Sequence, residues 1–336
     1  MRLILHIGVW KTGSSAIQIF LNRNDKALAR KGVLAPRFTR ARRGHTALVK
    51  AARLQDIRTL DRLCDRMWRE AEKAGAHTIV LSSEHFWQQT PQTLDLLAER
   101  LGSAPDTSID VIAYLRPQEE LWGSILAQQA KSLLVRPDGA LWGDRHYVGS
   151  GVANRGMYFG KCLRRFEKRF DANVIARHYD RNGFPGGDVV RAFLELAGIG
   201  EDGLDLSAGD ANLSLGWKGV AFSMALAAER RPVTGWRAAL LKRRLAATVR
   251  KMARLNDDPH WIGKSPVIFD TVERHRIRST YAEDEARLSR RFFGGSAPFP
   301  PVRDVSPTPF GPDALPPAEW AEAQRVLRRT LGLFKG

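Results

Sequence analysis

The first stretch of the chain constrains the fold most strongly, because a short apolar run is followed by a glycine-punctuated turn and then by a helical pattern. Residues 3–7 are dominated by Leu and Ile, with no turn former, which predicts a buried strand. Gly8 ends this strand, and residues 14–21 show helical spacing with hydroxyl residues at their start. In such a unit, free backbone N–H groups and the positive end of the helix dipole point at one place. Since Lys11 adds a full charge, we expect an anion-binding site here.

The spacing of this turn differs from the nucleotide-triphosphatase loop G-x-x-x-x-G-K-[ST]. Gly8 and Gly13 stand where that loop has its glycines, but Ser14 replaces its lysine, and the lysine has moved to Lys11. A Lys-Thr-Gly-Ser-Ser turn can hold a phosphate and a second anionic group, whereas the missing Gly-Lys-Ser/Thr ending argues against Mg-ATP. For this motif alone, an ordinary strand–turn–helix without a ligand is the alternative.

The composition is that of a globular protein with a large excess of positive charge. The chain has 336 residues, 43% of them hydrophobic, and its 53 Lys and Arg against 36 Asp and Glu give a net charge of +17. This charge favours an anionic ligand, whether a phosphorylated cofactor, an acidic glycan, nucleic acid or a lipid surface. With no membrane-spanning run and no secretory signal, we expect a cytoplasmic protein. We expect Cys64 and Cys162 to be buried and reduced.

A second buried strand is predicted over residues 78–81, and two candidate bases, Glu84 and His85, follow it closely. Because ligands bind at the carboxyl edge of an open parallel sheet, Glu84 is placed to act as a general base. The alternatives for Glu84 are a carboxylate that stabilises a helix N-terminus and a metal-binding acid of an ATPase-like site. Neighbouring side chains on extended chain point in opposite directions, so we expect only one of the two to serve.

A third strand over residues 109–115 leads to Arg116, and Pro117 opens a helical pattern that runs to Ser132. Ser124 follows Arg116 by eight residues, which is a rise of only ~12 Å along a helix. The two side chains can therefore share a ligand, and a guanidinium fork with a hydroxyl suits a second phosphate. A salt-bridged arginine and a surface serine are the alternative.

The rest of the chain shows further helices and one strand, followed by a mainly helical part. The expected elements are helices over 47–74, 92–102, 158–169, 189–196, 217–256 and 317–331, and a strand over 174–179. Residues 136–156 are expected to form a long loop of the kind that covers or binds ligands.

Three further segments carry predictions about function or organisation. The basic connection over 37–45 is either a solvated loop or the wall of an acceptor site, with His45 facing that site. Residues 229–254 carry nine Lys or Arg against one acid, which indicates a solvated helix face or contact with an anionic glycan or membrane surface. A Pro-rich connection is expected over 295–317.

Three motifs together resemble those of the PAPS-dependent sulfotransferases, in particular the bacterial carbohydrate-type branch. They are Lys-Thr-Gly-Ser-Ser at 11–15, Leu-Ser-Ser-Glu-His-Phe at 81–86 and Tyr-Leu-Arg-Pro-x6-Ser at 114–124, and weaker similarity extends to about residue 295. The resemblance implies two phosphate sites. The 5′-phosphosulfate would be held by Lys11, Thr12, Gly13, Ser14 and Ser15, and the 3′-phosphate by Arg116 and Ser124.

The expected fold is α/β, of the P-loop type with three layers: a central, mainly parallel sheet flanked by helices, in one domain over 1–336. A basic helical subregion at about 215–260 would shape the acceptor side. The implied reaction moves a sulfuryl group from PAPS to a hydroxyl or amine of a saccharide or glycolipid, leaves PAP, and requires no metal. Lys11 would stabilise the developing charge, and Glu84 or a histidine, with His85 as the second candidate, would take the proton.

Two other classes of function stay open. One is a P-loop kinase or nucleotide hydrolase that uses ATP-Mg. The other is a basic nucleic-acid-binding protein, although no finger, helix-turn-helix or stacking motif stands out. We expect no specific nucleic-acid partner and no membrane span, while peripheral contact with a membrane surface stays open.

Overall fold

The computed structural model describes residues 1–40, 44–131, 156–207, 215–229, 235–255, 257–263 and 266–330. The chain divides into two compact units. The first comprises Met1–Arg116, Arg155–Ala211 and Tyr281–Pro300, and the second comprises Pro117–Asn154, Asn212–Thr280 and Pro301–Gly336. The single domain expected over 1–336 stays a prediction.

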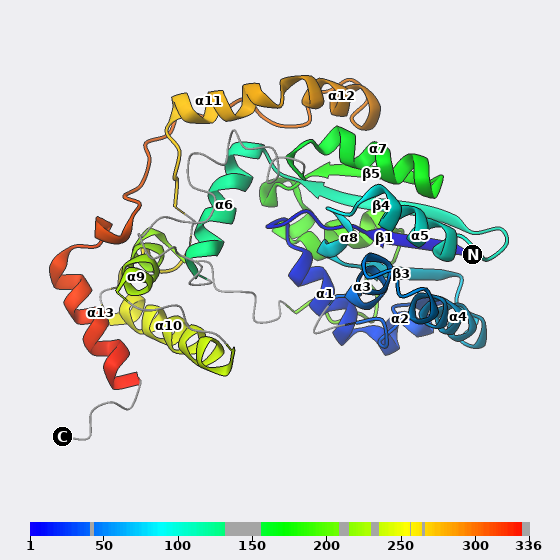
Figure 1. The fold of residues 1–336 in the computed structure, drawn as a ribbon, viewed down its shortest axis with the longest axis horizontal. Helices are drawn as coiled ribbons and strands as arrows, with labels where there is room; N and C mark the ends of the chain where they lie inside the picture. The colour runs from blue at the N-terminus through cyan, green and yellow to red at the C-terminus, as the bar shows by residue number, and fades with distance from the viewer. Residues whose placement is uncertain are drawn as a thin grey trace. The chain divides into compact units, whose positions relative to one another are not determined.

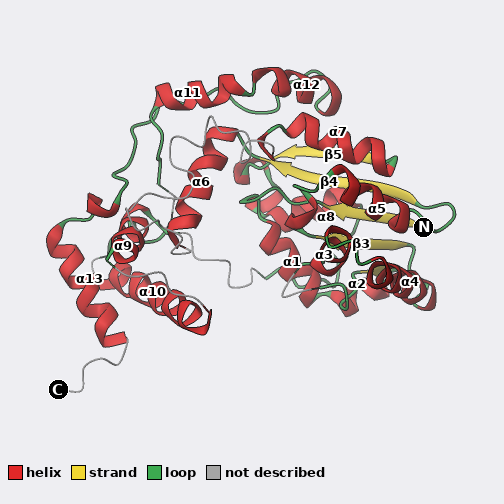
Figure 2. Ribbon diagram, in the orientation of Figure 1, coloured by secondary structure: helices red, strands yellow, loops and turns green. Residues whose placement is uncertain are grey.

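The first unit is built on a five-stranded parallel sheet with the strand order β2-β3-β1-β4-β5 (Figures 1 and 2). The strands are β1 (Arg2–His6), β2 (Val33–Leu34), β3 (Thr78–Ser82), β4 (Ser108–Leu115) and β5 (Asn173–His178). β3 is buried along its whole length, as expected for a parallel strand that is covered on both faces. The expected α/β fold with a parallel central sheet is therefore confirmed.

Helices cover both faces of this sheet. On one face α1 (Ser14–Arg23) packs against α8 (Val189–Ala197) and α2 (Asp25–Arg30). On the other face α3, α4, α5 and α7 pack on one another in turn, and α12 packs against α7. Their bounds are Thr46–Arg53, Ile57–Lys73, Pro91–Leu101, Phe159–Phe170 and Ala282–Phe292. This arrangement follows from right-handed crossovers, which put helices on opposite faces when the chain changes direction along the sheet.

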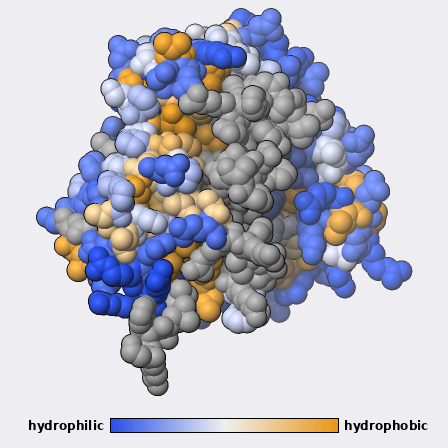
Figure 3. All heavy atoms as spheres, turned by 60° about the vertical axis from the view of Figure 1, so that its left-hand side comes forward, coloured by the Kyte–Doolittle hydropathy of each residue, from blue (hydrophilic) through white to orange (hydrophobic). Residues whose placement is uncertain are grey.

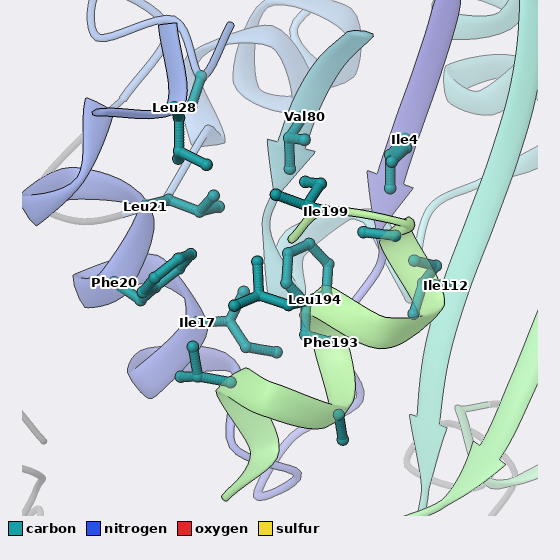
Figure 4. Packing of buried hydrophobic residues seen from close by; sticks show 14 of the residues in the cluster. Ile4, Ile17, Phe20, Leu21, Leu28, Val80, Ile112, Phe193, Leu194 and Ile199 are labelled. Atoms are coloured by element: carbon teal, nitrogen blue, oxygen red, sulfur yellow. The ribbon is translucent and has the colours of Figure 1, made fainter. Parts of the chain in front are cut away.

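The core between α1, α8 and the sheet fixes the position of the α1 N-terminus (Figure 4). α1 contributes residues spaced three and four apart, as an amphipathic helix does, and the strands contribute every second residue. These buried side chains include Ile17, Phe20 and Leu21 of α1, Phe193 and Leu194 of α8, and Ile4, Val80 and Ile112 of the strands. Each stabilises the fold by about 1.5–3 kcal/mol relative to an exposed side chain.

The second unit is helical in its described part. Its helices are α6 (Gln118–Lys131), α9 (Trp217–Ala228), α10 (Gly235–Leu255), α11 (Thr271–Thr280) and α13 (Pro317–Thr330), with a short turn η6 (Pro312–Ala314). The buried Glu119 of α6 accepts two hydrogen bonds from Arg278 of α11, both 3.1 Å. Lys218 of α9 pairs with Asp258 (2.7 Å) and with Glu319 of α13 (2.6 Å). The helical character expected at 215–260 is confirmed, and its acceptor role stays a prediction.

Several predicted elements differ in detail from those observed. The helix expected over 47–74 is two helices, α3 and α4, because Gln55 has φ 54° and Asp56 then caps α4 through the Thr59 N–H. The helix expected over 217–256 is likewise divided into α9 and α10, and α2, α11, α12 and β2 were not predicted. Apart from η6, residues 295–316 form no helix or strand, as expected for the Pro-rich connection. Of the predicted 136–156 loop, all but residue 156 lies outside the described residues.

The cysteines are as predicted. Cys64 and Cys162 are free and buried, and burial raises the pKa of both thiols to about 12. Both thiols are therefore protonated and unreactive near neutral pH. Among the described residues, no helix has both the length and the apolar character needed to cross a bilayer.

Candidate functional site

The candidate site lies at the carboxyl edge of the sheet, where β1 is flanked by β3 and β4. The chain leaves β1 toward α1 on one face and leaves β3 toward α5 on the other, so the winding direction reverses here. In open α/β sheets ligands bind at such a point, outside the carboxyl ends of the strands. The sheet order thus brings together the turn after β1, Glu84 after β3 and Arg116 after β4.

The N-terminus of α1 presents unpaired donors at this edge. Gly13 precedes the helix with φ 80°, and no side chain caps it. The Gly13 carbonyl accepts from Ala16 and Ile17, but within the described part of the chain nothing accepts a hydrogen bond from the N–H groups of Gly13, Ser14 or Ser15. These donors and the positive end of the helix dipole together favour an anion.

The turn itself is held by an internal hydrogen bond and by unusual backbone angles. Thr12 is fully buried, and its hydroxyl donates to the Val9 carbonyl (2.6 Å). Lys11 has φ 62°, in the left-handed region that is unfavourable for residues other than glycine. Thr12 therefore has a structural role in the turn, and its predicted contact with a cofactor stays a prediction.

Arg116 and Glu84 lie close enough to Lys11 to change the pKa of its ammonium group. The Lys11 side chain is exposed overall, yet the surrounding atoms desolvate its ammonium group enough to lower its pKa. Repulsion from Arg116 lowers the pKa further, and attraction to Glu84 acts in the opposite direction. Lys11 and Arg116, which follow neighbouring strands, are thus close enough to interact electrostatically, and their common ligand stays a prediction.

Glu84 and His85 belong to the short turn η1 (Glu84–Phe86), which begins directly after β3. Ser83 ties this turn to the sheet, because its N–H donates to the His6 carbonyl (3.0 Å) and its hydroxyl accepts from the His85 N–H (3.2 Å). Glu84 is half-buried and His85 is exposed. Since Glu84 acts on the pKa of Lys11, the structure favours it over His85 as the group that faces the anion turn.

Two buried histidines, His6 and His45, form hydrogen bonds with Ser82 at the end of β3. His6 Nδ1 and the Ser82 hydroxyl share a hydrogen bond of 2.8 Å, and burial lowers the pKa of His6 to about 3. The ring of His45 accepts from the Ser82 N–H (2.9 Å), and burial, followed by repulsion from Arg40, lowers its pKa to about 3. Both rings are neutral near pH 7. His45 is only 1% exposed, so its predicted contact with an acceptor has no support from this geometry.

Ser14 carries a buried hydroxyl at the start of α1. Its Oγ, like Nε2 of His6, is buried and has no hydrogen-bond partner in the described part of the chain. A Cβ on Gly8 would collide with this Oγ, so Gly8 lets the hydroxyl lie over the turn. Because leaving a buried polar group unsatisfied costs about 1–3 kcal/mol, Ser14 Oγ fits a bound anion.

Replacing Gly13 tests whether the turn must keep this shape. A Cβ there would lie 2.9 Å from Val189 Cγ1 and 3.0 Å from the Tyr179 ring, at a φ of 80°. We expect Gly13→Ala to lower the free energy of unfolding by about 1–2 kcal/mol, measured by urea denaturation, and to weaken anion binding in calorimetry. Gly75→Ala is the control, because Gly75 has φ 60° but nothing within 4 Å of its Cβ position. Equal effects of the two substitutions on anion binding would contradict this role.

Sequence reasoning left Tyr179 and Arg181 out of the site. The Tyr179 ring borders Gly13, and its hydroxyl accepts from Arg181 Nε (3.4 Å) in the short turn η4 (Arg181–Gly183). Arg181 therefore brings a third cation, after Lys11 and Arg116, to this part of the edge. The only signal was an aromatic and a basic residue after the fourth predicted strand, which many surface loops also have.

Ser124 lies on α6, which belongs to the second unit, and its side chain is buried. Arg116 is the last residue of the first segment of the first unit, and it is half-buried. Their shared contact with a phosphate stays a prediction. Among the described residues, no cluster of His, Cys, Asp or Glu could hold a metal ion.

No family model matches the chain, and no curated protein or solved structure matches it significantly. The similarity to sulfotransferases therefore stands on the three motifs themselves.

Proposed function

We propose that this protein is a sulfotransferase that moves a sulfuryl group from PAPS to a hydroxyl or amine. The observation that carries the proposal is the group of N–H donors at the start of α1 that have no acceptor in the described part of the chain, with Lys11 and Arg116 close enough to repel each other. An anionic ligand bound at this point would be attracted by both cations and would offset the repulsion that lowers the pKa of Lys11. The buried, unpaired hydroxyl of Ser14 adds a further donor for the same ligand.

The residues present fit the two ends of PAPS. Ser14, Ser15 and the N–H groups at the start of α1 would hold the 5′-phosphosulfate, with Lys11 beside it. Arg116 would hold the 3′-phosphate, with Ser124 as its predicted partner. The P-loop type of the fold belongs to the same proposal, because the parallel sheet with its β1–turn–α1 unit is common to several classes of α/β protein.

The chemistry assigns separate tasks to these side chains. Glu84 accepts the proton of the acceptor hydroxyl or amine as its oxygen or nitrogen forms a bond to sulfur. Lys11 and the N–H groups of the turn stabilise the negative charge on the phosphate oxygen when its bond to sulfur breaks. The acceptor is expected to be a saccharide or glycolipid.

Glu84→Gln should lower the rate of transfer by about 10²–10⁴-fold, because the variant has no group to take the acceptor proton. Transfer is measured with labelled PAPS and a panel of saccharides and glycolipids. The variant should bind PAP as tightly as the native protein or more tightly, because a negative charge beside Lys11 is gone.

His85→Gln is the matched control, since it changes the neighbouring exposed residue. It should leave transfer close to the native rate. Loss of transfer in His85→Gln with normal transfer in Glu84→Gln would assign the base to His85 instead.

A further inference from the structure

The outer face of α10 combines exposed apolar side chains with several Lys and Arg residues. The 21 residues of α10 include seven Lys or Arg and no acid. Its inner face is apolar and buried, through Leu241, Leu245, Val249 and Met252, and the helix packs on α13. The packing of α10 on the described part of the unit thus uses its inner face.

Residues on the outer face follow helical spacing from one end of α10 to the other. Trp236 is 71% exposed and Leu240, one turn later, is 37% exposed. Farther along lie the exposed side chains of Arg243, Arg250, Lys251 and Arg254. Because residues three or four apart share a face of a helix, the apolar pair and these four cations form one stripe. We call this stripe the α10 face.

An exposed tryptophan beside cations of one sign is the composition of a helix that lies in a membrane interface. Trp and Leu enter the boundary between headgroups and acyl chains, while Lys and Arg contact anionic headgroups. The exposed side of α4 is different, because it mixes basic and acidic residues. On the face of the molecule drawn in Figure 3, hydrophobic residues lie among strongly hydrophilic ones.

We propose that the α10 face binds an anionic lipid bilayer and holds the protein at the membrane surface. This inference does not depend on the proposed transfer reaction. Both parts of the face are needed: the cations attract the helix to the surface, and Trp236 with Leu240 anchors it there.

The test is sedimentation of the full chain with vesicles of phosphatidylcholine alone or mixed with phosphatidylglycerol, combined with tryptophan fluorescence. We expect binding only to the mixed vesicles. The triple variant Arg250→Gln, Lys251→Gln, Arg254→Gln should weaken binding at least ~10-fold, because each cation near an anionic surface contributes roughly fivefold. The control triple variant Arg58→Gln, Arg62→Gln, Arg69→Gln removes the same charge from α4 and should bind nearly as the native protein does.

The apolar part has its own matched pair. Trp236→Ser and Leu240→Ser should each weaken binding to mixed vesicles, whereas Leu54→Ser, which removes another exposed leucine, should not. Equal loss in the α4 and α10 triple variants would mean adsorption by net charge, and would overturn the proposal. Binding that survives Trp236→Ser and Leu240→Ser, or that is equally strong to a soluble polyanion such as heparin or DNA, would overturn it as well.

Discussion

Lys11→Ala should reduce sulfuryl transfer by about 10²–10³-fold, the usual effect of removing one group that stabilises developing charge. Lys11 has a left-handed backbone conformation within the turn, which leads into the N–H donors of α1 that have no acceptor in the described part of the chain. We do not expect Arg116 to replace it, because Arg116 follows a different strand and has its own predicted phosphate. The measurement is transfer of label from PAPS, together with calorimetric titration of PAP.

Lys73→Ala is the control for this substitution, because it removes an exposed lysine at the end of α4. It should leave both transfer and PAP binding unchanged. Lys11→Ala should not alter the free energy of unfolding appreciably, or should raise it, since it removes a cation that Arg116 repels. Native rates of transfer in Lys11→Ala would remove Lys11 from the mechanism.

Acid should unfold this protein steeply, because His6 and His45 are buried as neutral rings. Folding lowers the pKa of both from 6.5 to about 3. Between these values the unfolded chain binds two protons that the folded chain does not, so stability falls as the pH falls. The slope is about 1.4 kcal/mol per pH unit for each histidine. Above about pH 6.5 both rings are neutral in both states, and their effect on stability is constant.

Urea denaturation at several pH values between about 7 and about 4 measures this slope. His6→Gln should reduce the slope by about 1.4 kcal/mol per pH unit, whatever its effect on stability at neutral pH. His275→Gln replaces an exposed histidine of α11 and should leave the slope as it is. The explanation fails if the native protein and His6→Gln show the same dependence on pH.

The strands that carry the site could be predicted from the sequence because each is a short run of buried aliphatic residues. β2 could not, since Val33–Leu34 is too short to show a pattern and forms only by pairing with β3. The break between α3 and α4 had a local signal, Asp56 followed three residues later by Thr59, but the many Ala, Leu, Arg and Glu residues around it concealed the break.

The site itself was only partly predictable. Lys11, Glu84 and Arg116 follow strands of one parallel sheet, whose carboxyl ends meet at one edge, so their proximity followed from the fold. The burial of His45 did not, because it depends on contacts with Ser82 and Arg40 that lie outside any local pattern. For the same reason, no local pattern indicated that the Ser14 hydroxyl would be buried without a hydrogen-bond partner among the described residues.

The central claim is that Lys11 and Arg116 bind opposite ends of one doubly phosphorylated nucleotide. The most direct measurement is calorimetric titration of the native protein and Arg116→Ala with adenosine 3′,5′-bisphosphate, adenosine 5′-monophosphate and ATP-Mg. We predict that the native protein prefers the 3′,5′-bisphosphate, and that Arg116→Ala loses at least ~10-fold in affinity for it, as expected for a charged hydrogen bond, while affinity for the 5′-monophosphate is unchanged. Two results would contradict the claim. One is tighter binding of ATP-Mg than of the 3′,5′-bisphosphate by the native protein, and the other is an equal loss of affinity for the 3′,5′-bisphosphate and the 5′-monophosphate in Arg116→Ala.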